Sequence, residues 1–207
     1  MVRGICVCGD AGIATSSRDR TVRFCSLDPA QKNKCTSSKI MLGHNSFVGP
    51  LAWISPDESF PEGRIVSGGM DTLVLLWDLK TGETMQTMKG HQLQVTGLAI
   101  DDNADIISAS VDCTLRRWRN GQPIESWEAH KAAIQAVIKL PSGELITGSS
   151  DSTLKLWRGR TCLHTFVAHT DTVRGLAVMP GFGVLSASHD GCGIPDILTA
   201  TMALRSN

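Results

Sequence analysis

The sequence lacks an excess of either positive or negative charge. Among 207 residues, 20 Lys and Arg balance 20 Asp and Glu, so the formal net charge is zero. A neutral chain has no bulk electrostatic attraction for nucleic acid or for an anionic membrane. We therefore expect neither nucleic acid nor a membrane surface among its partners.

Long apolar runs and tyrosine are also missing. No stretch approaches the roughly 20 apolar residues that span a bilayer, and the segment before Asp10 is too short for the apolar core of a signal peptide. The chain has no Tyr and only five Phe, but 20 Gly and eight Pro. This composition favours many short strands joined by turns. We expect an all-β protein that remains inside the cell.

Cysteine motifs are missing although seven cysteines are present. Neither a C-x-x-C pair nor a matching His-x-x-x-His is found, so no zinc site and no disulfide framework is indicated. Cys6 and Cys8 would share one face of a strand and could approach a metal, but ordinary packing is the simpler interpretation. Phosphate-binding glycine motifs are absent as well. We expect reduced thiols, no metal and no cofactor.

A repeat of about 40 residues organises the chain. Each copy combines a histidine, a later hydroxyl residue, an aspartate four residues after the hydroxyl and, in three copies, a tryptophan six residues after the aspartate. The three complete sets are His44, Ser67, Asp71 and Trp77; His91, Ser108, Asp112 and Trp118; and His130, Thr147, Asp151 and Trp157. The first copy has only Thr15 and Asp19, and the fifth has His169, Ser186 and Asp190 without a tryptophan.

Each copy also shows a strand, turn, strand pattern. Four strands per unit, with a Gly-His start and a Trp-Asp type end, resemble a blade of a WD40 β-propeller. The resemblance implies blades at about 1–43, 44–90, 91–129, 130–168 and, in part, 169–191. The second copy carries six extra residues, which we place in a surface loop at 56–63.

The pattern ends at Gly191, and Pro195 interrupts the segment where pairing should continue. The fifth blade is expected to keep two strands, followed by a tail without WD character at 192–207. A ring of seven such blades needs roughly 270 residues. We therefore expect an incomplete propeller of four to five blades, with the tail arising from truncation or alternative splicing.

The recurring His, Ser/Thr and Asp sets could be interpreted as catalytic groups, because these three residue types can form a nucleophile, its base and an orienting carboxylate. Repetition favours a structural role instead, since an active site is needed once. We expect each aspartate to accept a hydrogen bond from its histidine, the histidine to contact the hydroxyl, and the hydroxyl to meet the indole N–H. Trp53 and Trp127 lie outside these sets; packing in the core or between blades is expected for each, and a role as an exposed binding aromatic is the alternative.

Several segments resemble the N-terminal propeller of the phospholipase A-2-activating protein family. These are residues 17–23, 43–48, 60–63, 155–160 and 169–177. The resemblance implies a non-enzymatic protein that binds ubiquitin and serves ubiquitin-dependent protein degradation in the cytoplasm and nucleus. In that family, docking on an AAA-ATPase segregase depends on further domains that are missing here.

The binding surface is expected where the residues before each turn aspartate meet the residues after each histidine. The residues proposed to bind ubiquitin or another partner there are Arg18, Phe47, Met70, Gln94 and Val111. A general WD40 scaffold or substrate receptor for another protein is the alternative. A hydrolase is disfavoured, because no G-x-S-x-G elbow occurs.

Overall fold

The computed structural model describes residues 1–28, 30, 34–181, 183–191 and 193–195. Within these residues the chain forms antiparallel β-sheets and no helix, as the composition predicts. No helix long and apolar enough to cross a bilayer is therefore found in the described part.

Four sheets have four strands each, and their strands follow one another in chain order. The first two sheets comprise β1 (Val2–Cys8), β2 (Gly12–Ser17), β3 (Thr21–Leu27), β4 (Cys35–Leu42), β5 (Val48–Ile54), β6 (Arg64–Gly69), β7 (Val74–Asp78) and β8 (Thr84–Met88). The next two comprise β9 (Val95–Ile100), β10 (Ile106–Ser110), β11 (Thr114–Arg119), β12 (Gln122–Glu128), β13 (Ile134–Lys139), β14 (Leu145–Ser149), β15 (Leu154–Arg158) and β16 (Thr161–Phe166).

The fifth sheet has one strand more than the sequence led us to expect. It contains β17 (Val173–Met179), β18 (Gly183–Ser188) and the short β19 (Gly193–Pro195), which pairs with β18. Pro195 ends this edge strand, a position that tolerates a residue without a backbone N–H. The expectation of two strands was therefore wrong. Residues 192 and 196–207 of the expected tail lie outside the described residues.

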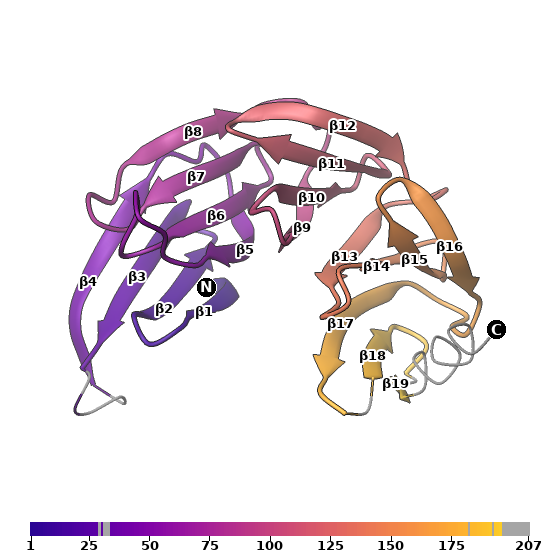
Figure 1. Cartoon of the computed structure of the whole chain (residues 1–207). Coiled ribbons are helices and arrows are strands. Elements are labelled where there is room, and N and C mark those ends of the chain that lie inside the picture. Colours follow the sequence, from indigo (N-terminus) through magenta and orange to yellow (C-terminus); the bar gives the residue numbers. More distant parts are fainter. Residues whose placement is uncertain (29, 31–33, 182, 192, 196–207) are drawn as a thin grey trace.

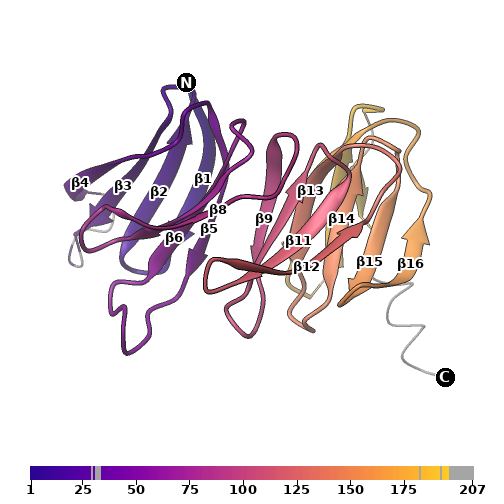
Figure 2. The same ribbon diagram turned by 90° about the horizontal axis from the view of Figure 1, so that it is seen from above.

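The five sheets stand side by side in an open arc (Figure 1). The first strand of each sheet lies on the inner side of the arc, and the fourth strand of each complete sheet lies on the outer side. Figure 2 shows the same sheets from above, with the first sheet at one end and the fourth and fifth sheets toward the other. The sheets do not close into a ring, which is the incomplete WD40 propeller that the repeat predicts.

The cores lie between neighbouring sheets. Strand residues alternate between the two faces of a sheet, so a sheet that stands between two others contributes one apolar face to each of them. Between the first two sheets, for example, Phe24 and Met41 pack with Ile65 and Trp77, all almost fully buried. Trp127 packs in the core between the third and fourth sheets, and Trp53 is half-buried against the first core. Both tryptophans therefore pack as expected.

One pair of cysteines departs from the expected reduced state. Cys25 and Cys35, on adjacent strands β3 and β4, form a disulfide with their Cα atoms 5.8 Å apart. A bulge next to Leu27 shifts the register of the two strands and brings Cys35 diagonally opposite Cys25. The expected reduced state is wrong for this pair. The spacing of cysteines along the chain does not reveal the pair, because the two residues meet only through the register of β3 and β4. Cys6, Cys8, Cys113 and Cys162 are free thiols.

Candidate functional site

The polar sets form linked hydrogen bonds inside the second, third and fourth sheets. In the second sheet, His44 Nε2 lies 2.8 Å from Ser67 Oγ, and Trp77 Nε1 lies 2.7 Å from the same oxygen. The indole N–H can only donate, so Ser67 Oγ accepts it and donates its own proton to His44 Nε2. His44 Nδ1–H then donates to Asp71 at 3.0 Å. The order is the one expected from the sequence.

The same geometry recurs in the next two sheets. The histidine Nδ1 to carboxylate distances are 2.8 Å for His91 and Asp112 and 3.0 Å for His130 and Asp151. The hydroxyls of Ser108 and Thr147 join these histidines to Trp118 and Trp157 at 2.7 to 2.9 Å. In the fifth sheet His169 bonds Asp190 and Ser186, each at 2.8 Å. The first sheet has no histidine, but Thr21 Oγ1 donates to Asp19 at 2.6 Å, as Thr114 and Thr153 donate to Asp112 and Asp151.

Burial and hydrogen bonding together set the charge state of these groups. Burial would raise the pKa of Asp112, but hydrogen bonds from Thr114, the Gln92 N–H and His91 outweigh it and hold the pKa at about 2. Burial lowers the pKa of His91 and of His130, and the neighbouring aspartates only partly oppose this. The four histidine side chains in the sets have no exposed surface. In the third and fourth sheets the set therefore holds a neutral histidine beside a carboxylate, and every set ties a turn to its sheet.

Each histidine loop is also tied to the aspartate turn of its own sheet through the backbone. The residue before the aspartate donates its N–H to the carbonyl of the third residue after the histidine. The four bonds are Met70 to Phe47 at 2.8 Å, Val111 to Gln94 at 3.0 Å, Ser150 to Ala133 at 2.9 Å and His189 to Thr172 at 3.0 Å. These loops and turns form one surface of the arc, which we call the loop face.

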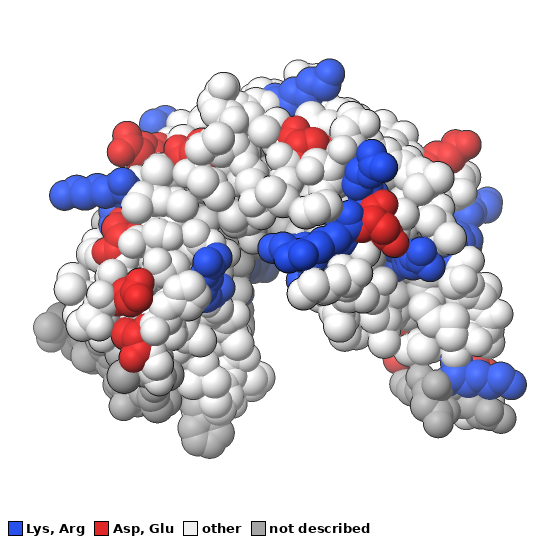
Figure 3. All heavy atoms as spheres, turned by 180° about the vertical axis from the view of Figure 1, so that it is seen from behind, with Lys and Arg blue, Asp and Glu red and all other residues white. Residues whose placement is uncertain are grey.

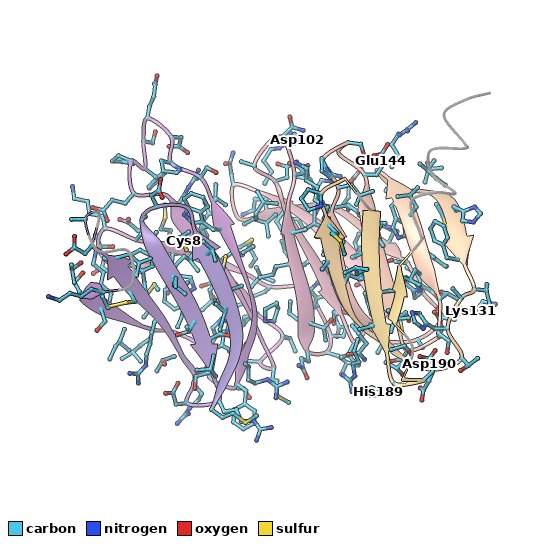
Figure 4. The ribbon with its side chains drawn as sticks, turned by 90° about the horizontal axis from the view of Figure 1, so that it is seen from below. Cys8, Asp102, Lys131, Glu144, His189 and Asp190 are labelled. Carbon is cyan, nitrogen blue, oxygen red and sulfur yellow. A yellow bond between two sulfur atoms is a disulfide. The ribbon has the colours of Figure 1, made fainter. Side chains whose placement is uncertain are left out.

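The loop face is distinct from the opposite face of the arc. In Figure 4, Lys131, His189 and Asp190 lie along one edge, while Asp102 and Glu144 lie along the other. The structure thus brings the two groups of predicted binding residues together on one side of the molecule.

An exposed apolar cluster lies on the loop face between the first and second sheets. Phe47 is 38% exposed and Met70 is 42% exposed, although both are large apolar residues. Arg18, from the first sheet, stacks over the Phe47 ring with 5.7 Å between the guanidinium carbon and the ring centroid. We call these three residues the apolar cluster. Gln94 and Val111 are half-buried on the same face.

The sequence reasoning missed Leu93, which is 49% exposed in the histidine loop of the third sheet. Its position, two residues after a repeat histidine, was the signal that could have identified it. No group of three or more His, Cys, Asp or Glu side chains suited to a metal ion is found in the described part of the chain.

Comparisons with known proteins agree with the fold. The family model described as "WD domain, G-beta repeat" matches residues 34–78, 82–119, 121–158 and 160–192. The chain is 34% identical to the Phospholipase A-2-activating protein of Xenopus laevis over 122 residues, which cover 58% of this chain and 15% of that protein. It is 31% identical to the p21-activated protein kinase-interacting protein 1-like of Danio rerio over 107 residues, 51% of this chain and 26% of that protein.

Among solved structures, the WD40 β-propeller domain of Doa1 superposes with a TM-score of 0.74 at 30% identity. The match covers 92% of this chain and 62% of that one. This chain thus spans less than two thirds of the length of each protein named here.

Proposed function

The chain belongs to the WD40 repeat family, and we propose that it binds ubiquitin through the apolar cluster of its loop face. The observation that carries the proposal is the exposure of Phe47 and Met70 beside Arg18, at the junction of two sheets. Large apolar side chains gathered on the surface of a folded protein mark interaction sites. The choice of ubiquitin rests on the likeness to the phospholipase A-2-activating protein family.

The proposed role is that of a non-enzymatic adaptor in ubiquitin-dependent degradation, in the cytoplasm and nucleus. The histidines of the four sets are buried, and both ring nitrogens of each already have hydrogen-bond partners. These groups are engaged in holding the blades, so the loop face would act by binding.

A binding titration tests the proposal. We expect the full chain to bind monomeric ubiquitin in isothermal titration calorimetry, and the double variant Phe47→Asp with Met70→Asp to lose at least about tenfold in affinity. Placing a charge in an apolar contact leaves it desolvated and unpaired. The aspartates would remain exposed in the free protein, so the fold should persist.

The matched control is the double variant Ile124→Asp with Leu163→Asp. These residues are 44% and 40% exposed but lie on β12 and β16, the outer strands of the third and fourth sheets. Binding should be unchanged in this control. Equal loss in both variants, or no binding by the unmodified chain, would reject the proposal. Binding of an unrelated partner through Phe47 and Met70 in place of ubiquitin would favour the scaffold alternative.

A further inference from the structure

The inner strands of all five sheets surround a hollow of about 460 Å³ at the centre of the arc. It is lined by residues of β1, β5, β9, β13 and β17 and by Gln94, which directly precedes β9. Beside Gly and aliphatic residues the lining includes Arg3, Thr96, Gln135 and Arg174, and it has no Asp, Glu or aromatic side chain. Figure 3 views the molecule from behind and shows Lys and Arg side chains on both arms of the arc near this hollow. The hollow is therefore a polar site with a positive bias in an otherwise neutral protein.

A β-bulge near the start of each inner strand sets what faces the hollow. In β1 the pairing passes from Val2 to Gly4, and in β17 it passes from Val173 to Gly175. The extra residues are Arg3 and Arg174, and the corresponding extra residues in β9 and β13 are Thr96 and Gln135. A bulge takes a residue out of the ladder and redirects its side chain. The two arginines therefore occupy equivalent positions at the two ends of the arc.

Arg174 is held in place by two side chains, neither of them acidic. Its Nη1 donates to Gln135 Oε1 at 2.9 Å, and its Nε donates to His189 Nε2 at 3.1 Å. Gln135 is in turn oriented by donating from Nε2 to Ser150 Oγ at 2.9 Å. Neither Arg174 nor Arg3 forms a salt bridge with any acidic residue in the described ranges. The Arg174 guanidinium is oriented by these bonds, and both arginines are solvent-accessible and without an acidic partner among the described residues.

From this arrangement we propose that the hollow is a second binding site, which takes an acidic peptide segment of a partner protein through carboxylate pairs with Arg3 and Arg174. A planar guanidinium binds a carboxylate with two parallel hydrogen bonds. The hollow offers no aromatic platform on which nucleic-acid bases could stack, and the neutral chain lacks the long-range field that a polyanion would need. A peptide with spaced carboxylates fits both conditions. The site does not depend on the apolar cluster, and of the residues proposed to bind ubiquitin only Gln94 lines it.

The test uses fluorescein-labelled peptides of about twelve residues in fluorescence anisotropy. One peptide carries four Asp or Glu residues separated by Gly and Ser, a second has Asn and Gln in their place, and a third has phosphoserine. We expect the acidic peptide to bind at least tenfold more tightly than its amide counterpart, and its affinity to fall as salt is raised from 0.05 to about 0.3 M. Tighter binding of the phosphoserine peptide than of the carboxylate peptide would overturn the assignment to carboxylates.

Arginine variants locate the site. Arg3→Gln with Arg174→Gln should lower the affinity for the acidic peptide about tenfold or more, since each removes a charge-assisted hydrogen-bonded pair. The control is Arg160→Gln, an exposed arginine at the turn between β15 and β16 that is remote from the hollow. Equal effects of the two changes would show that binding is a general charge effect and would overturn the proposal.

A charge-reversal variant distinguishes loss of the binding site from loss of the fold, because an unfolded protein would not gain affinity for a new peptide. Arg174→Glu should weaken the acidic peptide further and create measurable affinity for the same peptide with Lys in place of its acidic residues. The variant Phe47→Asp with Met70→Asp should bind the acidic peptide as the unmodified chain does. Loss of peptide binding in that variant would contradict a separate site, whereas loss of ubiquitin binding alone would not affect it.

Discussion

At the scale of single residues, the recurring hydrogen-bonded sets explain why so few residue types define the repeat. Each set needs a donor that cannot accept, a hydroxyl that can do both, and a ring with two different nitrogens. Tryptophan, Ser or Thr, and histidine supply these in order, and the aspartate accepts the last hydrogen bond. Because every member is satisfied, the network stabilises the buried turn rather than leaving polar atoms unpaired.

The pKa shifts of these residues predict how stability depends on pH. The pKa values of His91 and His130 are lower in the folded protein than the ordinary value of 6.5. Below that value the unfolded chain binds protons that the folded chain does not, so the free energy of unfolding falls as pH falls. We expect the urea midpoint to be lower at pH 5.5 than at pH 7.5.

A further loss is expected at acid pH. The pKa of Asp112 lies at about 2 against an ordinary 3.8, so its stabilisation of about 2 kcal/mol is present above pH 3.8 and lost as pH falls toward 2.

The control for the histidine prediction is His164→Gln, because this histidine is exposed and belongs to no hydrogen-bonded set. The dependence of the unfolding midpoint on pH should be the same in this variant as in the unmodified chain. An unfolding midpoint that is equal or higher at pH 5.5 would contradict the expectation.

At the scale of elements, the aspartate turns share a left-handed backbone conformation, which favours glycine but is occupied by glycine in only one of the five turns. The residue after the aspartate has a positive φ in every sheet: 71° at Arg20, 69° at Thr72, 68° at Cys113, 67° at Ser152 and 79° at Gly191. Only the fifth copy uses glycine, which adopts this region without steric cost. The other four turns hold a side chain in a left-handed conformation because the surrounding hydrogen bonds require it.

Replacing Thr72 by glycine should therefore stabilise the protein. A β-branched residue is the least suited to positive φ, and relief of this strain should raise the free energy of unfolding by about 1 kcal/mol. Thr72→Ala keeps the Cβ atom and should give little or no gain. Urea unfolding of both variants measures the difference. A stabilisation by alanine as large as that by glycine would assign the effect to the Thr side chain rather than to the backbone.

At the scale of the whole molecule, the face of the first sheet that points away from the second is apolar, and no other sheet of the described residues packs against it. Leu98 of β9 and Ile5 of β1 occupy equivalent positions after the Val-x-Gly start of an inner strand. Leu98 packs against the second sheet and is 9% exposed, whereas Ile5 is 68% exposed. The same sequence position is thus a core residue or a surface residue depending only on whether a sheet precedes it.

This difference predicts unequal costs of truncation. Leu98→Ala should lower the free energy of unfolding by about 3 kcal/mol, because it removes buried atoms and leaves a cavity. Ile5→Ala should cost less than about 1 kcal/mol, as expected for an exposed position. Urea unfolding of the two variants in parallel provides the comparison. Similar costs for both would mean that the outer face of the first sheet is covered.

The sequence by itself determined the strands, the repeat and the hydrogen-bonded sets, because each depends on residue types at short, regular spacing. From the order of residues it also placed Phe47, Met70 and Arg18 on a common face. It did not predict the Cys25–Cys35 disulfide, which depends on strand register, or the third strand of the fifth sheet, a short edge strand that ends at Pro195 and carries no repeat residue. The uncovered face around Ile5 and the hollow between Arg3 and Arg174 were decided by tertiary structure alone. They arise from the curvature of the arc, which places residues at opposite ends of the chain around one space and leaves the end sheets apart.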